Sequence, residues 1–494
     1  MIEFGSETNR INKIISDGAK NGMNDIKFLE SEIKKWKNSQ IRKNMVIACN
    51  YYKGEQDILK RKRTVIGEQG ALIEVENLPN NKIIDNQYSK LVDQKTNYML
   101  AKPPTFETDN EMYSALLKEI FNNKFLRTLR NIGEDSINNG IAWLHPYYNE
   151  LGEFCFKRFP AYEILPFWKD ADHTVLDKAV RIYEVQGYEG EKEVSIEKVE
   201  VYDNEGIQRF VFKNNRLVLD VENPSSSYVI SIDEKGNETT LNWSKIPLIP
   251  FKYNNNEIPL ITRVKSFQDG INTIISDFQN NMQEDARNTI LVLQNYDGTN
   301  LGEFRRNLAQ YGAVKVKTIE GASGDLKTLE IKVNAENYKV IYEILKKAII
   351  ENGRGFDAKD DRLSGNPNQM NIQSMYSDID LDANGMETEY QASFEDLLWF
   401  VNTHIFNSEK LDFEKEKVKI IFNRDILINE TESIDNCAKS TGILSNETII
   451  SQHPWTSDVK RELKKIEEEK KKSIDEYENA FLSKKSSGDL DGEE

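Results

Sequence analysis

The sequence predicts an α+β fold in which long helices flank a β-rich middle region. Apolar residues recur at helical spacing in residues 111–140, 264–288 and 370–405, which predicts amphipathic helices. Between about residues 141 and 260, apolar and polar residues alternate around Gly-containing turns, which predicts β-hairpins. The chain has 494 residues, of which 38% are hydrophobic, so it is long enough for several packed domains.

The N-terminal half is predicted to begin with helices and to continue as hairpins. Residues 1–48 have an amphipathic helical pattern, and residues 111–140 place Leu117, Leu129 and Ile132 near helical spacing. Two segments then alternate as half-buried strands do: IAWLHPYYNELGEFCFKRF and EKVEVYDNEGIQRFVFKNNRLVLDVE. This half is therefore predicted to combine helices with an antiparallel sheet.

The helix predicted over residues 264–288 has one narrow apolar seam and a separate acidic face. At 1.5 Å per residue it would span roughly 37 Å. The seam recurs every three or four residues and consists of Val264, Phe267, Ile271, Ile274, Phe278 and Met282. The acidic face carries Asp269, Asp277 and Glu284, one or two turns apart.

Residues 289–334 are predicted to form a small α/β insertion before a second helix over residues 335–352. TILVLQN, AVKVKTI and LKTLEIKV have strand-like composition, and LGEFRRNLAQ is predicted to be a short helix. Asn334 can cap the following helix, whose apolar positions include Ile341, Leu345 and Ile349.

A polar connection, NGRGFDAKDDRLSGNPNQMNIQ, joins that helix to the next one. Its glycines and Pro367 interrupt helical structure, and Gly353, Gly355 and Gly365 are expected to let it move. Loops of this length are usually functional or disordered. Its formal charges sum to zero, because Arg354, Lys359 and Arg362 stand against Asp357, Asp360 and Asp361.

The C-terminal region is predicted to be helical. A helical apolar period extends over residues 370–405, with Gly385 as a kink site because glycine weakens a helix interior. Residues 406–494 are predicted to form charged helices that end in a disordered acidic tail, SSGDLDGEE.

Composition and motifs exclude several classes of protein. A net charge of −17 argues against a general nucleic-acid binder, which would present a basic face. Three separated cysteines predict neither a disulfide framework nor a zinc site, and the start of the chain does not resemble a signal peptide. No apolar run approaches a membrane span. Walker A, GxGxxG and HExxH motifs are absent from the sequence, so no enzyme activity, cofactor or metal is predicted.

Two charged segments need their own interpretation. DLDANGMETEYQ places Asp380, Asp382, Asn384 and Gly385 at positions 1, 3, 5 and 6 of a calcium loop, but Gln391 stands where a bidentate Glu is required. A calcium-binding protein is therefore a minor alternative. The basic run Lys60–Arg63 is interpreted as a solvated face.

Four segments, in this order, resemble the portal proteins of tailed double-stranded-DNA bacteriophages, of the siphophage type from Gram-positive hosts. They are YYKGEQDILKRKR with NNKIIDNQYSKLVDQKTNYMLAKPPTF, then IPLIPFKYNNNE with SFQDGINTIISDFQNNMQEDARNTILVLQNYDG, then LSGNPNQMNIQSMYSDIDLDANGMETEYQASFEDLL, and finally TGILSNETIISQHPWTSDVKRELKKIEEE. The remaining alternative within this class is another virion structural protein, such as a head–tail adaptor, although adaptors are usually much shorter.

The resemblance implies a ring-forming portal fold whose parts can be assigned along the chain. The assignment is a wing (1–263), a two-helix stem (264–288 and 335–352), a clip (289–334), a tunnel loop (353–369), a kinked wing helix (370–405), and a crown with the acidic tail (406–494). The seam of the first stem helix is then expected to pack stem helices of neighbouring subunits against each other.

The resemblance also implies a function and partners. Twelve subunits would form a channel at one capsid vertex through which double-stranded DNA is packaged and ejected, in a virion assembled in the host cytoplasm. Terminase and then a head-completion adaptor would dock on the clip, and capsid and scaffold proteins would contact the wing or crown. Asp269, Asp277 and Glu284 would line the channel, and the six charged loop residues would meet the DNA.

Overall fold

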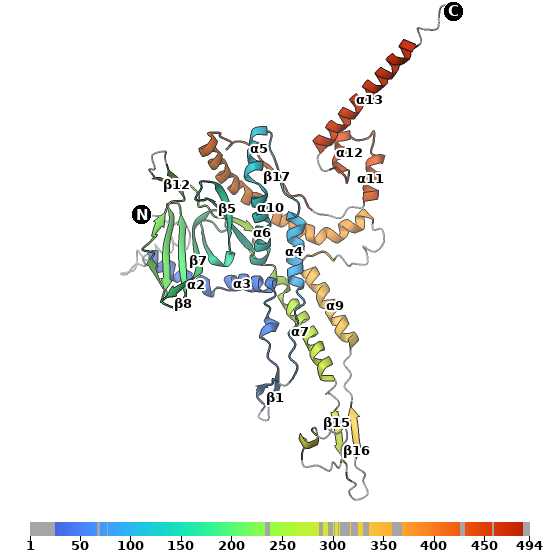
Figure 1. Cartoon of the computed structure of the whole chain (residues 1–494). Helices are drawn as coiled ribbons and strands as arrows, with labels where there is room; N and C mark the ends of the chain where they lie inside the picture. The colour runs from blue at the N-terminus through green and yellow to red at the C-terminus, as the bar shows by residue number, and fades with distance from the viewer. Residues whose placement is uncertain are drawn as a thin grey trace, which may run out of the picture. The chain divides into compact units, whose positions relative to one another are not determined.

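Figure 1 shows the computed structural model of the chain, which describes most residues between Asp25 and Ser487. The residues outside the description in that span are 67–69, 77, 233–237, 286–289, 295–299, 301, 305, 307–316, 318–324, 330–334, 358–367, 425–429 and 457–458. The chain divides into two compact units. Unit 1 comprises Met1–Gly355 and Leu381–Arg424, and unit 2 comprises Phe356–Asp380 and Asp425–Glu494.

The N-terminal helices of unit 1 begin at polar caps. A side-chain oxygen of Ser39, Asn86, Asn110 or Asn122 accepts a backbone N–H in the first turn of the helix that follows it. The single helix predicted over residues 111–140 is divided in two, because Asn122 caps a new helix. The helices are α2 (Asp25–Asn38), α3 (Gln40–Lys53), α4 (Gln87–Leu100), α5 (Glu111–Ile120) and α6 (Asn123–Asn139), with the 3₁₀ turn η1 at Asp57–Lys60.

The middle region forms antiparallel sheets, which confirms the predicted hairpins. A three-stranded sheet has the order β14-β4-β5, from Ile249–Lys252, Ile141–Tyr148 and Phe154–Phe159. A larger sheet has the order β10-β9-β8-β7-β6, and short β11 (Ser225–Ser226) pairs with β9. Its strands are β6 (Ile164–Trp168), β7 (Leu176–Glu189), β8 (Lys192–Asp203), β9 (Gly206–Lys213) and β10 (Arg216–Leu219), with the 3₁₀ turn η2 (Ala161–Glu163) before β6.

Three further strand pairs lie in unit 1. β1 (Thr64–Ile66) pairs with β2 (Leu72–Glu74), and β12 (Val229–Ile232) pairs with β13 (Glu238–Leu241). β3 (Thr105–Glu107) pairs with β17 (Lys419–Ile421), more than 300 residues away along the chain. The predicted all-helical character of residues 406–494 is therefore wrong at β17, and residues 406–424 belong to unit 1.

The core of unit 1 is rich in aromatic side chains. Phe394 is fully buried, and its ring packs nearly perpendicular to those of Phe251 and Phe121 at centroid distances of 5.6 and 6.2 Å. Gly140 ends α6 in the left-handed conformation (φ 82°), and a Cβ there would lie 2.0 Å from the Glu257 carbonyl oxygen. Only glycine fits this close approach.

The two predicted stem helices are present and pack against each other. α7 covers Ile261–Asp285 and α9 covers Ala335–Asn352 (Figure 1). The Tyr338 ring of α9 packs on Phe278 of α7 at 5.1 Å, and Asn281 donates a hydrogen bond of 2.8 Å to the Tyr338 hydroxyl. Val264 and Ile271 of the predicted seam are buried in this chain's own core, whereas Met282 is 51% exposed.

Between these helices, β15 (Ile290–Gln294) and β16 (Asp325–Leu329) form an antiparallel pair. This pair agrees with two of the strands predicted for the insertion, TILVLQN and LKTLEIKV. The third, AVKVKTI, and most of the predicted short helix lie largely outside the described residues.

The long helix α10 covers Gln369–Glu409, close to the predicted 370–405. It remains helical through Gly385, where a Cβ would meet open space, so the kink stays a prediction. Unit 2 also contains α11 (Glu430–Lys439), α12 (Asn446–Gln452) and α13 (Val459–Ser487). In unit 2 the Glu432 carboxylate accepts the backbone N–H of Gln369 at 2.9 Å. The residues after Ser487 in the predicted acidic tail lie outside the description.

Candidate functional site

A polar stripe on α7 holds an extended segment of the chain that we call the arm (residues 55–86). The stripe repeats every four residues and is completely buried: Gln268, Asn272, Ser276 and Asn280. A repeat of four places these side chains on one helix face. That face would be expected to be apolar if hydrophobic burial alone determined it.

The stripe binds mainly the backbone of the arm and of the residues that follow it. The side-chain oxygens of Asn272 and Ser276 accept the N–H groups of Asp85 and Ile83 at 3.1 and 3.0 Å. Gln268 accepts the N–H of Tyr88 at 3.0 Å and donates to the Asp85 carbonyl at 2.7 Å. The end of the arm thus satisfies backbone groups of Ile83 and Asp85 against a helix instead of a neighbouring strand.

Two of the predicted channel-lining carboxylates are engaged by other side chains of the chain, and one of them, Asp277, contacts the arm. Asp269 receives hydrogen bonds from Tyr51 (2.5 Å) and Lys265 (2.7 Å), and its side chain is 34% exposed. Asp277 forms an ion pair of 2.5 Å with Arg61 of the arm and is 33% exposed. Both carboxylates therefore have cationic partners within the chain. The side chain of Glu284 lies outside the description.

The predicted solvated face at Lys60–Arg63 is confirmed for only part of the run. The side chains of Lys60 and Lys62 are 80% and 67% exposed. That of Arg61 is 22% exposed because it reaches Asp277 on α7. Here the prediction is wrong, because a partner more than 200 residues away is invisible to a local charge pattern.

The base of the predicted tunnel loop is packed against α4. The N–H groups of Gly353 and Gly355 donate to Ile349 and Ile350 carbonyls at 2.9 and 2.8 Å. A Cβ at either glycine would lie 2.3 or 2.5 Å from a methyl carbon of Leu91. Close packing against Leu91 therefore requires glycine at both positions.

Five residues surround this position and form what we call the loop-base cluster: Lys95, Tyr253, Arg263, Arg354 and Asp382. Asp382 accepts hydrogen bonds from Lys95 (2.7 Å), from Arg263 (3.1 Å) and from the Tyr253 hydroxyl. The Arg354 guanidinium lies 3.6 Å from the same carboxylate, and the Arg354 carbonyl accepts a bond of 2.9 Å from Lys95.

Burial and charge act in opposite directions on the cluster. Lys95 and Asp382 are only 5% and 8% exposed. Burial lowers the pKa of Lys95 to about 8, although the Asp382 carboxylate raises it. Burial alone would raise the pKa of Asp382, but Lys95, Tyr253 and Arg263 hold it below its usual value. One carboxylate is thus stabilised as an anion among three basic side chains.

The cluster also decides against the calcium-loop interpretation. Asp380, Asp382 and Asn384 lie on the continuous helix α10, whereas a calcium loop turns sharply at its glycine. The Asp382 carboxylate is engaged by Lys95 and Arg263, and the Asn384 side chain accepts from Arg424 at 2.5 Å. Among the described residues, no group of three His, Cys, Asp or Glu side chains is arranged to hold a metal ion.

The structure describes only part of the predicted loop. Arg354 is 52% exposed, and Asp357 is half-buried within unit 2. Phe356, beside it in unit 2, stacks on Tyr376 at a centroid distance of 4.3 Å. The other four predicted loop residues, Lys359, Asp360, Asp361 and Arg362, lie outside the described residues.

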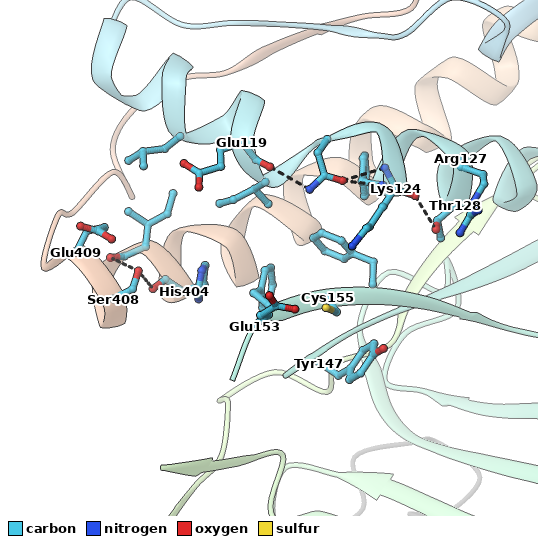
Figure 2. A pocket seen from close by; sticks show the side chains of 17 residues that line it. Glu119, Lys124, Arg127, Thr128, Tyr147, Glu153, Cys155, His404, Ser408 and Glu409 are labelled. Carbon is cyan, nitrogen blue, oxygen red and sulfur yellow. Dashed lines mark hydrogen bonds between the residues drawn. The ribbon is translucent and has the colours of Figure 1, made fainter. Parts of the chain in front are cut away.

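Figure 2 shows a separate pocket of about 510 Å³ formed by α5, α6, β5 and the end of α10. Its apolar wall includes Phe125 and Phe156, and Lys124 and Glu153 are among its charged residues. His404 stacks on Phe154 at 4.6 Å, and burial lowers its pKa. The residues predicted for the DNA channel do not line this pocket.

Sequence reasoning missed the stripe and most of the loop-base cluster. The stripe had a visible signal, since Gln268, Asn272, Ser276 and Asn280 repeat at four-residue spacing beside the apolar seam. The cluster had none, because Lys95 and Asp382 are separated by 287 residues. Asp382 was noticed only as part of a calcium-like pattern.

Comparison with known proteins agrees with the architecture. Residues 32–476 match the family model described as "Phage portal protein, SPP1 Gp6-like". Because the match covers most of the chain, the protein belongs to this family of phage portal proteins. Portal proteins are structural virion components, and the match to a portal family, rather than to adaptors, decides against a head–tail adaptor.

Two relatives support the assignment over nearly the whole length. The portal protein of Bacillus phage SPP1 is 27% identical over 471 residues, covering 94% of this chain and 90% of that protein. The portal protein of Clostridium phage phiCD119 is 28% identical over 455 residues, covering 89% of this chain and 96% of that protein. Both are phages of Gram-positive bacteria. None of the helices among the described residues is long and apolar enough to cross a membrane.

Proposed function

We propose that twelve copies of this chain form a ring at one capsid vertex, with a central channel for packaging and ejecting double-stranded DNA. The observation that carries this proposal is the match of most of the chain to phage portal proteins. The packed helix pair α7–α9, with the β15–β16 pair between them in sequence, supports the assignment of a stem and a clip.

The proposed parts follow the chain. The wing comprises residues 1–263 and returns in the helix of 370–405, with Gly385 as its kink site. The stem comprises 264–288 and 335–352, the clip 289–334, the tunnel loop 353–369 and the crown 406–494. The structure suggests a later start for the crown, since residues up to Arg424 belong to unit 1.

A conduit for DNA must avoid binding it tightly. A protein with several basic phosphate contacts binds DNA strongly, which would hold a moving duplex in place. Twelve chains of charge −17 carry a formal charge of −204. Acidic side chains within about 8 Å of the duplex would repel its phosphates without full screening. Asp269, Asp277 and Glu284 are proposed to line the channel, with the charge of the first two offset by Lys265 and Arg61.

The tunnel loop is proposed to meet the duplex with balanced charge. Its basic residues would touch phosphates transiently, and its acidic residues would cancel net attraction. The six residues are Arg354, Lys359, Arg362, Asp357, Asp360 and Asp361.

The proposed partners act in sequence during assembly in the host cytoplasm. Terminase would supply the motor and dock on the clip, and a head-completion adaptor would then occupy the same region. Major capsid and scaffold proteins would contact the wing or crown. The chain itself is proposed to be a structural channel without catalytic activity or cofactor.

The native mass of the purified chain tests the proposal. The subunit has a mass of 57.1 kDa, so twelve copies give about 685 kDa. A ring of that mass in native mass spectrometry supports the proposal. A strict monomer, even at high protein concentration and with scaffold protein added, would contradict it.

A further inference from the structure

We propose that Lys95, Arg263 and Asp382 act as positioning residues that hold the base of the tunnel loop through Arg354. This inference rests on the proposed function, because it assigns a task to the residues from which the proposed loop starts. It predicts that the residues up to Gly355 stay attached to α4 and α10.

The position of the cluster in the chain is the first argument. The chain leaves unit 1 after Gly355 and returns to it at Leu381. Arg354 precedes the first of these points and Asp382 follows the second, so one cluster around the buried Asp382 carboxylate holds the chain at both. The third such point is after Arg424, whose guanidinium donates to Glu387 of α10 at 2.6 Å.

The backbone of Arg354 is the second argument. Arg354 has φ 51°, in the left-handed region that non-glycine residues rarely adopt. Such a conformation persists where its surroundings determine it. Here the surroundings are specific, because Lys95 binds the Arg354 carbonyl at 2.9 Å and the Arg354 N–H donates to Glu351 at 3.1 Å.

The composition of the cluster is the third argument. Three basic side chains share one buried carboxylate, and a buried ion pair is often no more stabilising than apolar residues of similar volume. Stability alone therefore gives a weak reason for this arrangement. The arrangement has a direct explanation if its task is to hold Arg354, because the cluster contacts both the carbonyl and the guanidinium of that residue.

Packing on the same helix reinforces the attachment. Leu91 lies one turn before Lys95 on α4, and its methyl groups fill the space beside Gly353 and Gly355. α4 thus contacts the loop base through one apolar and one charged side chain. Apolar contact fixes the distance between α4 and the glycines, and the charged contact fixes the orientation of Arg354.

The test measures hydrogen exchange in the full-length protein. In Asp382→Asn, the amides of residues 353–355 are expected to exchange at least about tenfold faster, because the carboxylate no longer holds the basic side chains around Arg354. A matched control is Lys178→Met, which removes another buried ion pair, Lys178–Asp203, with side chains 7% and 5% exposed. In the control, exchange at residues 353–355 should stay unchanged.

A second variant separates positioning from folding. Lys95→Met combined with Asp382→Leu replaces the buried pair by apolar side chains and should keep the fold. It is expected to show the same accelerated exchange at residues 353–355 and slower DNA packaging, with the mass of the assembly unchanged. Unchanged exchange in this variant, or wild-type packaging despite faster exchange, would overturn the inference.

The exchange readout is independent of the proposed function. It needs neither a ring nor DNA, so faster exchange in a chain that forms no ring would retain the attachment and reject the portal assembly. Unchanged exchange in a chain that forms a ring and packages DNA would reject the attachment alone.

Discussion

Replacing Gln268 by Met tests whether the buried polar stripe of α7 holds the arm. Gln268 is fully buried and joins the Tyr88 N–H and the Asp85 carbonyl to α7. Met has nearly the same length but offers no equivalent hydrogen bonds, so the Tyr88 N–H loses its partner, whereas the Asp85 carbonyl keeps the Gln87 N–H at 2.8 Å. A buried group left without a partner costs about 1–3 kcal/mol, so local stability should fall by about that amount.

Hydrogen exchange of the arm measures this effect directly. A loss of about 2 kcal/mol corresponds to roughly thirtyfold faster exchange of the Asp85 and Tyr88 amides, if they exchange through local opening of the arm. The control is Gln279→Met at an exposed position of the same helix, which should change stability by less than about 0.5 kcal/mol. Exchange in Gln268→Met that matches the control would refute the reasoning.

Three further predictions concern other parts of the chain. His145 is buried, and burial lowers its pKa from 6.5 to about 3. Between these values the unfolded chain binds more protons than the folded one, so the free energy of unfolding should fall by up to about 5 kcal/mol as pH drops from 6.5 to 3. His145→Phe should flatten that part of a pH titration of stability. Gly140→Ala should lower the melting temperature far more than Gly152→Ala. Both glycines have positive φ, but only at Gly140 would an added Cβ meet a backbone oxygen, the carbonyl oxygen of Glu257. Equal melting temperatures of the two variants would contradict the steric argument. Alanine should be placed at the basic loop residues Arg354, Lys359 and Arg362. This change should slow DNA packaging in an in vitro assay while the mass of the ring is retained. Packaging at the wild-type rate would show that the loop is only a connector.

The helices and hairpins were predictable because their signals are local. The seam of α7 and the alternation in β4, β5, β8 and β9 arise from residues a few positions apart, and the structure contains these elements. The division of residues 111–140 at Asn122 was missed, because an asparagine within a continuous apolar period can be either a cap or a surface residue.

The candidate site was less predictable because its partners are distant in sequence. Asp269 and Asp277 lie on one acidic helix face, and the resemblance to portal proteins predicts that this face lines a channel. Their contacts with Tyr51 of α3 and Arg61 of the arm depend on how distant segments pack on α7. The pairing of Lys95 with Asp382 likewise exists only after α4 and α10 have packed together. Periodicity identifies the face of a helix and carries no information about what covers that face.

The pairing of β3 with β17 has a consequence for synthesis on the ribosome. β3 is translated long before Lys419–Ile421, and the fully buried Tyr390 and Phe394 also arrive late. At about 5–20 residues per second, the ribosome needs roughly 15–60 s to travel from residue 140 to residue 424. During that interval the nascent chain exposes the apolar surfaces of α6 and β14 that α10 later covers. Production of this protein should therefore depend on chaperones that shield nascent chains, and fragments ending before Ile421 should aggregate.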